Sequence, residues 1–115
     1  MRTDTYGMEK ETQTLIQALC RQDGQAQRRV LQLYGTMIFG QVARIVTCQE
    51  DAEEVYQDVF VKIFRNIQSY DSRQASLATW MSRIAYNESL NFVRRARQPV
   101  IYVDDRDVDL ESIQD

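Results

Sequence analysis

A stripe of aromatic, amide and cationic side chains near the end of the chain is the first candidate for a binding surface. When residues 77–97 are wound as a helix, at about 100° per residue, one side becomes apolar and a second side becomes polar. Arginine pairs with phosphate, asparagine hydrogen-bonds to base edges, and an aromatic ring stacks on a base. The polar side therefore suits single-stranded nucleic acid, although it could also be a solvated face with its aromatic ring used for packing. Its members are Trp80, Arg83, Asn87, Asn91 and Arg94.

The polar segment 68–76 lies directly before this helix and interrupts the apolar periodicity. It reads as a loop, and loops on rigid scaffolds often carry binding groups. A plain helix–helix connection is the alternative. The small donors and acceptors beside the stripe are Tyr70, Ser72, Arg73, Gln74, Ser76 and Thr79.

A second polar face is predicted on the preceding helix, over about residues 49–67. Three of its members, Glu54, Gln57 and Asp58, fall at i, i+3 and i+4 and so form one patch that could dock a basic partner helix. The like-charge pair Glu54–Asp58 hints at such a partner. The alternative is a solvated face with an Asp58–Lys62 ion pair. The whole face comprises Asp51, Glu54, Gln57, Asp58, Lys62 and Arg65.

No set of residues is suited to catalysis. Histidine, the commonest general base and metal ligand, does not occur in the chain. Cys20 and Cys48 lie 28 positions apart and match no zinc or CxxC spacing. There is also no glycine-rich phosphate loop. We therefore expect a binding protein that is not an enzyme and that carries no metal and no cofactor.

Net charge depends on which part of the chain is counted. The 115 residues carry a formal charge of -3, which by itself argues against a nucleic-acid partner. However, residues 1–98 contain 13 Lys and Arg against 11 Asp and Glu, whereas residues 99–115 contain one Arg and six acids. An acidic tail thus follows a slightly basic body.

The sequence gives no sign of export or of a membrane span. The N-terminus lacks the apolar run of a signal peptide, and no stretch approaches the ~18 apolar residues of a membrane helix. Together with cysteines that show no pairing pattern, this predicts a cytoplasmic location.

Four helices must position these surfaces. No proline precedes Pro99, and apolar residues recur at helical spacing, so we predict helices over about 9–21, 25–46, 49–67 and 77–97. The predicted fold is an all-α, compact bundle of three long helices plus a shorter N-terminal helix. An extended acidic C-terminal tail, in which 100–103 could form a short strand, follows it.

Several residues are expected to mark the helix ends and contacts. Gly24 is predicted to be a left-handed cap, and Ser76 to be the N-cap of the last helix. Thr47 and Glu50 have the spacing of a capping box. Gly35 and Gly40 are expected to allow close packing against a neighbouring helix.

Two motifs, separated by the loop, carry a family resemblance. DAEEVYQDVFVKIFRNIQSYD (51–71) and LATWMSRIAYNESLNFVRR (77–95) are similar to region two of bacterial sigma factors, and most similar to the extracytoplasmic-function (ECF) group. The resemblance covers about residues 9–98. The first motif is matched by Asp51, Ala52, Glu53, Glu54, Gln57, Asp58 and Phe60, and the second by Leu77, Trp80, Met81, Ile84, Ala85, Asn87 and Asn91.

The resemblance implies a transcription initiation factor. Its implied partners are core RNA polymerase, bound through the β′ clamp helices, promoter DNA, mainly the single-stranded minus-ten element, and an anti-sigma factor. The implied clamp-binding residues are Asp51, Glu54, Gln57, Asp58 and Phe60. The implied DNA-binding residues are Ser72, Arg73, Gln74, Ala75, Ser76, Leu77, Trp80, Asn87 and Asn91, with Arg83 and Arg94 added as phosphate contacts from the helical-face argument.

Within this resemblance Asn87 belongs to the base pocket, and Trp80 supports the loop and the melted junction. Asn91 stands where many relatives have an acid.

The resemblance also sets the expected domain limits. Residues 1–98 correspond to the region-two domain and residues 99–115 to an acidic inter-domain linker. The helix-turn-helix region four of such factors is not in the sequence, so we expect a fragment that binds core polymerase but recognises promoters poorly. The alternative is a stand-alone helical adaptor or regulator that occupies the polymerase clamp without reading DNA.

Overall fold

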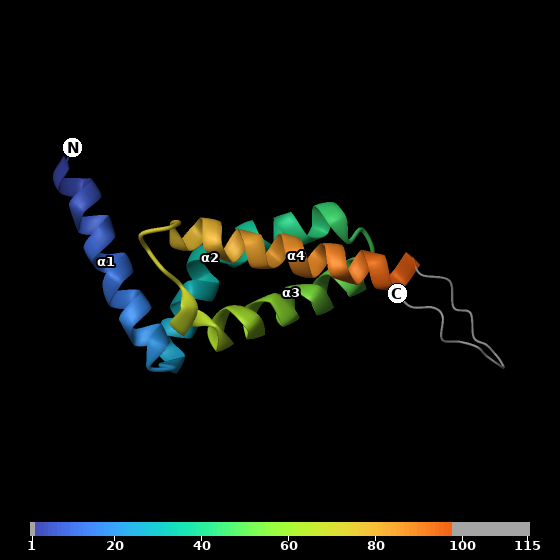
Figure 1. The fold of residues 1–115 in the computed structure, drawn as a ribbon, viewed down its shortest axis with the longest axis horizontal. Coiled ribbons are helices and arrows are strands. Elements are labelled where there is room, and N and C mark those ends of the chain that lie inside the picture. The colour runs from blue at the N-terminus through green and yellow to red at the C-terminus, as the bar shows by residue number, and fades with distance from the viewer. Residues whose placement is uncertain (1, 98–115) are drawn as a thin grey trace.

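Four α-helices and one 3-10 turn make up the part of the chain that the computed structural model describes, residues 2–97 (Figure 1). The all-α prediction is confirmed. The helices are α1 (Arg2–Cys20), α2 (Gly24–Ile45), α3 (Gln49–Arg65) and α4 (Leu77–Arg97), with the 3-10 turn η1 (Ile67–Ser69) after α3. The predicted acidic tail and the possible strand at 100–103 lie outside the described residues.

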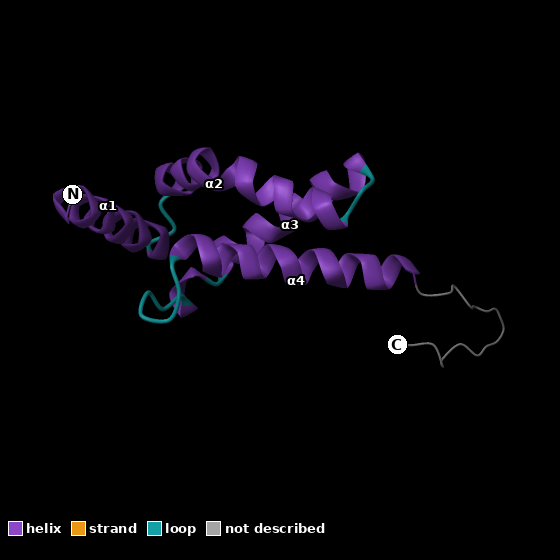
Figure 2. Cartoon of the chain, turned by 90° about the horizontal axis from the view of Figure 1, so that it is seen from above, coloured by secondary structure: helices purple, strands orange, loops and turns teal. Residues whose placement is uncertain are grey.

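The first helix is longer than the sequence indicated. It has 19 residues against 17 in α3, so the prediction of a shorter N-terminal helix is wrong. Figures 1 and 2 show α1 projecting at an angle from the other three helices, which it meets near its C-terminal end. Apolar periodicity revealed only this packed end, where Leu19 is buried.

The core lies between α2, α3 and α4. Figure 2 shows α4 running alongside α2, and α4 packs against both α2 and α3. Each helix contributes aliphatic residues at three- and four-residue spacing, as an amphipathic helix must in order to bury one face. Almost fully buried members are Val30, Ile38, Val42, Val55, Val59, Ile63, Leu77, Met81 and Ala85.

Gln22, not Gly24, adopts the left-handed conformation between α1 and α2 (φ 60°). Around it, the N–H of Asp23 donates to the carbonyl of Ala18 and the N–H of Gln22 to that of Leu19, the two bonds of a Schellman motif. Its side-chain amide also donates to the carbonyl of Phe64 (3.1 Å). Gly24 instead begins α2, and the Asp23 carboxylate caps that helix by accepting from the N–H of Gln25 (3.0 Å).

The N-terminus of α3 also differs from expectation. Cys48 is the N-cap and makes no side-chain capping bond, so the predicted Thr47–Glu50 capping box is wrong by one register position. The start of α4 is as predicted: Ser76 Oγ accepts a hydrogen bond from the N–H of Thr79 (3.1 Å).

The two glycines in the interior of α2 have different surroundings. A Cβ at Gly35 would lie 2.8 Å from the hydroxyl oxygen of Tyr56, whereas a Cβ at Gly40 would meet nothing within 4 Å. The Tyr56 ring is held edge-on between Phe39 and Phe60 (centroid distances 5.5 and 5.2 Å). Close packing is therefore confirmed for Gly35, and the same expectation for Gly40 is wrong.

This contrast predicts opposite effects of two alanine substitutions. Gly40→Ala should stabilise the protein by about 1 kcal/mol, because alanine is the better helix former and the site is open. Gly35→Ala should instead destabilise it by roughly 1 kcal/mol or more, because the new methyl group displaces the Tyr56 hydroxyl. Free energies of unfolding in urea measure both effects.

A double-mutant cycle with Tyr56 tests whether the clash with its hydroxyl causes the loss of stability in Gly35→Ala. In a Tyr56→Phe background the clashing oxygen is absent, so Gly35→Ala should become neutral or stabilising. An equal loss in both backgrounds would contradict the assigned contact.

Candidate functional site

The loop between η1 and α4, residues 70–76, is closed by its first residue, Tyr70. The hydroxyl of Tyr70 donates to the carbonyl of Ala75 (2.7 Å), which joins the two ends of the loop. The Tyr70 ring also packs against Trp80 of α4, with centroids 5.3 Å apart. Trp80 is half-buried beside the core, so it braces the loop and is not part of an exposed stripe.

Asp71 and Arg73 form an ion pair within this loop. The guanidinium Nη2 lies 3.1 Å from Asp71 Oδ2, and the N–H of Arg73 donates to Asp71 Oδ1 (2.9 Å). The hydrogen bonds from Arg73 lower the pKa of the Asp71 carboxyl, and the Asp71 carboxylate raises the pKa of Arg73. Ser72 and Gln74 are exposed on either side of Arg73, so the loop presents polar groups to solvent.

The structure separates the predicted DNA-binding residues into two groups. Leu77, which was predicted among the DNA-binding residues, is only 3% exposed and belongs to the core. The four remaining stripe residues of α4 are exposed: Arg83, Asn87, Asn91 and Arg94. Within this group Arg94 Nη1 donates to Asn91 Oδ1 (3.2 Å), which orders the C-terminal part of the stripe.

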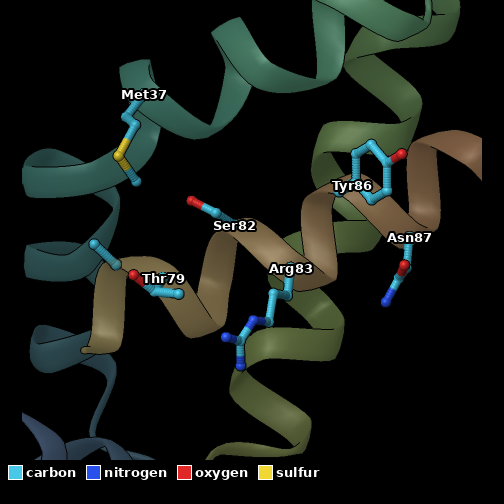
Figure 3. Close-up of a pocket in the computed structure, with 7 residues that line it drawn as sticks. Met37, Thr79, Ser82, Arg83, Tyr86 and Asn87 are labelled. Carbon is cyan, nitrogen blue, oxygen red and sulfur yellow. The ribbon is translucent and has the colours of Figure 1, made fainter. Parts of the chain in front are cut away.

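A shallow groove of about 640 Å³ adjoins this stripe, between α2 and α4 (Figure 3). Met37 reaches from α2 towards Thr79 and Ser82 of α4, while Arg83 and Asn87 extend from α4 along its other edge. Sequence reasoning missed Met37, Ser82 and Tyr86 as lining residues. Met37 comes from another helix, α2, so the helical wheel of α4 alone could not reveal the groove.

The acidic patch on α3 is also present on the surface. Glu54, Gln57 and Asp58 are exposed together, and Asp51 is half-buried one turn earlier. Phe60, which was predicted among the clamp-binding residues, is only 4% exposed and belongs to the core. It packs beneath the patch, where its ring meets that of Tyr56.

Lys62 pairs with α4 and not with Asp58. Its Nζ lies 2.7 Å from Glu88 Oε2, in place of the predicted i,i+4 pair within α3. Lys62 therefore does not offset the like charges of Glu54 and Asp58. A second hollow beside the patch, between α2 and α3, also escaped sequence reasoning; it is lined by Leu31, Gly35, Thr36, Phe39, Glu53, Tyr56 and Gln57.

Neither a metal centre nor a membrane span is found among residues 2–97. No three His, Cys, Asp or Glu side chains in this range are grouped so as to hold a metal ion. None of the helices described is long and apolar enough to cross a membrane.

The chain belongs to the sigma-70 region 2 family, whose pattern matches residues 30–98. This family consists of sigma factor domains, which are not enzymes. The match begins within α2 and includes all of α3, the loop 70–76 and α4.

Curated relatives are ECF-type sigma factors. The RNA polymerase sigma-H factor of Pseudomonas aeruginosa is 30% identical over 79% of this chain and 47% of its own length. The ECF RNA polymerase sigma factor SigW of Bacillus subtilis is 27% identical over 84% of this chain and 51% of its own length. The ECF RNA polymerase sigma-E factor of Haemophilus influenzae is 30% identical over 76% and 46%. The chain thus spans about half the length of the curated relatives that it matches.

A solved structure shares the fold. It is an NMR structure of an engineered region 2 of sigmaE in complex with GTAAAA, with a TM-score of 0.65 and 28% identity over 72% of this chain and 85% of that one.

The Tyr70 brace predicts a pH dependence of stability. Burial, then Asp71 and Tyr34, raise the pKa of Tyr70, so the folded state favours the neutral phenol. The contribution of this neutral phenol to stability is complete below about pH 10, the ordinary pKa of tyrosine. It is lost as the pH rises through the raised pKa of Tyr70 in the folded protein.

Tyr70→Phe should therefore lower the free energy of unfolding by about 1 kcal/mol at pH 7. It should also reduce the fall in that free energy above pH ~10. Urea unfolding between pH 7 and 11 measures both. Tyr86→Phe, which removes an exposed hydroxyl, serves as the control. A Tyr70→Phe pH profile parallel to that of the wild type would refute the assignment.

Proposed function

We propose that this domain binds core RNA polymerase and recognises the single-stranded minus-ten promoter element during transcription initiation. One observation carries the proposal. The loop 70–76, closed by Tyr70, leads directly into an exposed α4 face with Asn87 and Arg83, on a fold shared with a region 2 solved with GTAAAA.

On the DNA side, the loop and the exposed face of α4 form the recognition surface. Ser72, Gln74 and the Asn87 amide offer hydrogen bonds to an unstacked base, and Arg83 and Arg94 offer contacts to its phosphates. Extruding a base costs a few kcal/mol, which such polar contacts offset. Binding of the extruded strand then favours strand separation, without chemistry on the DNA.

On the polymerase side, the α3 patch is the docking surface. Glu54, Gln57 and Asp58 present an acidic, hydrogen-bonding face that complements a basic clamp helix of the β′ subunit. Asp51 lies at its edge. The buried Phe60 supports this surface from below, as Leu77 supports the loop.

From family membership we also propose the domain limits, the cellular location and the regulation of this protein. Residues 1–98 form the region 2 domain, and residues 99–115, on their acidic composition, form a linker to a further domain. The protein acts in the cytoplasm, where polymerase and promoters are found. An anti-sigma factor regulates it.

Base recognition is tested by Asn87→Ala. The variant should bind a fluorescent GTAAAA oligonucleotide about five- to tenfold more weakly than the wild type, because one hydrogen-bonding group is lost. Fluorescence anisotropy measures the dissociation constants. Gln32→Ala, an exposed amide elsewhere on α2, is the matched control.

A base-scrambled oligonucleotide completes this test. If wild type and Asn87→Ala bind both oligonucleotides equally, base recognition by α4 is excluded and the adaptor function is favoured.

Polymerase binding is tested by combining Gln57→Ala with Asp58→Ala. The loss of a charge and an amide from the centre of the patch should weaken binding to purified core RNA polymerase by about tenfold or more. Pull-down and competition assays measure the effect. The control pair Glu11→Ala with Gln13→Ala removes a carboxylate and an amide from α1 instead. If both double variants bind polymerase equally well, the assignment of the α3 patch as the docking surface is wrong.

A further inference from the structure

The groove beside the α4 stripe continues beyond the residues assigned to minus-ten recognition. A second hollow between α2 and α4 shares Ser82 and Tyr86 with the first and adds Gln41, Arg44 and Ile45. Because the two hollows share a wall, they form one track along α4. This track begins at Thr79, next to the loop 70–76, and ends at Arg44.

An exposed aromatic ring stands in the middle of the track. Tyr86 is 56% exposed, and its ring lies on the α2 side of α4 (Figure 3). Met37 faces the same groove from α2 and is 37% exposed. Folding thus leaves an aromatic face uncovered at a point where both hollows meet, as a stacking platform requires.

The charges along the track have one sign. Arg83 and Arg44 are exposed and line its two hollows, and no acidic side chain is among the described residues that line them. Glu88, the one acid of α4, is held by Lys62 of α3. A polyanion can therefore follow the track without meeting a carboxylate.

A hydrogen-bond acceptor in the second hollow supports the same ligand class. Gln41 Oε1 is buried and has no hydrogen-bond partner in the described part of the chain. A buried acceptor without a partner is unfavourable, and a donor from an incoming group would satisfy it. Bases carry such donors as exocyclic amines or ring N–H groups.

We propose that the α2–α4 track binds an extension of the same DNA strand whose minus-ten bases the loop 70–76 recognises. A base stacks on Tyr86, and a backbone phosphate pairs with Arg44. The inference rests on the proposed function and adds a second, sequence-tolerant contact to it. The absence of acids from the lining favours a nucleic acid over a basic peptide, and the arginines favour it over an apolar helix.

Oligonucleotide length provides the test. The 115-residue chain is titrated with fluorescent GTAAAA and with the same hexamer extended by six thymidines at either its 5′ or its 3′ end. One of the extended oligonucleotides should bind about tenfold more tightly than the hexamer, as expected for one added stacked base with its phosphate.

Variants locate the source of this gain. Tyr86→Ala should abolish it, Tyr86→Phe should keep it, and neither should alter hexamer binding. Arg44→Gln should reduce the gain and lower the salt dependence, the slope of log K against log salt, by about 0.7. Arg28→Gln, an exposed arginine of α2 outside both hollows, is the charge control. Circular dichroism verifies that each variant is folded.

Two results would overturn the inference: no gain from either extension, or a gain that survives both Tyr86→Ala and Arg44→Gln. A dodecamer of thymidine separates this from failure of the proposed function. If minus-ten recognition is absent but Tyr86→Ala still weakens dodecamer binding, strand binding by the track is supported and base recognition by the loop and Asn87 is refuted.

Discussion

The burial of one face of α4 against both α2 and α3 is the constraint on which the rest of the structure depends. Leu77, Met81 and Ala85 are almost inaccessible to solvent, and together they fix the rotation of the helix about its axis. Because side chains on a helix have fixed angular positions, this rotation leaves Arg83 and Asn87 outside. The same packing against α2 creates the groove at Tyr86.

Local contacts then adjust what the surface presents. Trp80 packs on Tyr70, whose hydroxyl closes the loop 70–76, so the loop emerges at the N-terminus of α4 in a defined shape. Lys62 holds Glu88 against α3. The exposed face of α4 is therefore basic although the whole chain has a net charge of -3, and the acids of α3 form a separate surface.

The sequence predicted elements better than contacts. The range of α4 and its Ser76 cap were predicted correctly, because an apolar period, a cap and a later proline all agreed there. The capping box failed because Cys48 is the N-cap, which moves the third helical position from Glu50 to Asp51. The left-handed turn fell on Gln22 because two backbone hydrogen bonds and a bond to Phe64 hold it there.

Residue types and spacing by themselves determined the fold class, the absence of histidine chemistry and the polar faces of α3 and α4, since helical periodicity is a property of one segment. Tertiary structure alone decided which matched residues are accessible. Phe60 and Leu77 fit the family motifs but are buried, whereas Met37 and Tyr86, which no motif marks, line an open groove. The physical reason is that burial and grooves arise between helices, from side chains distant in sequence that only the packed bundle brings together.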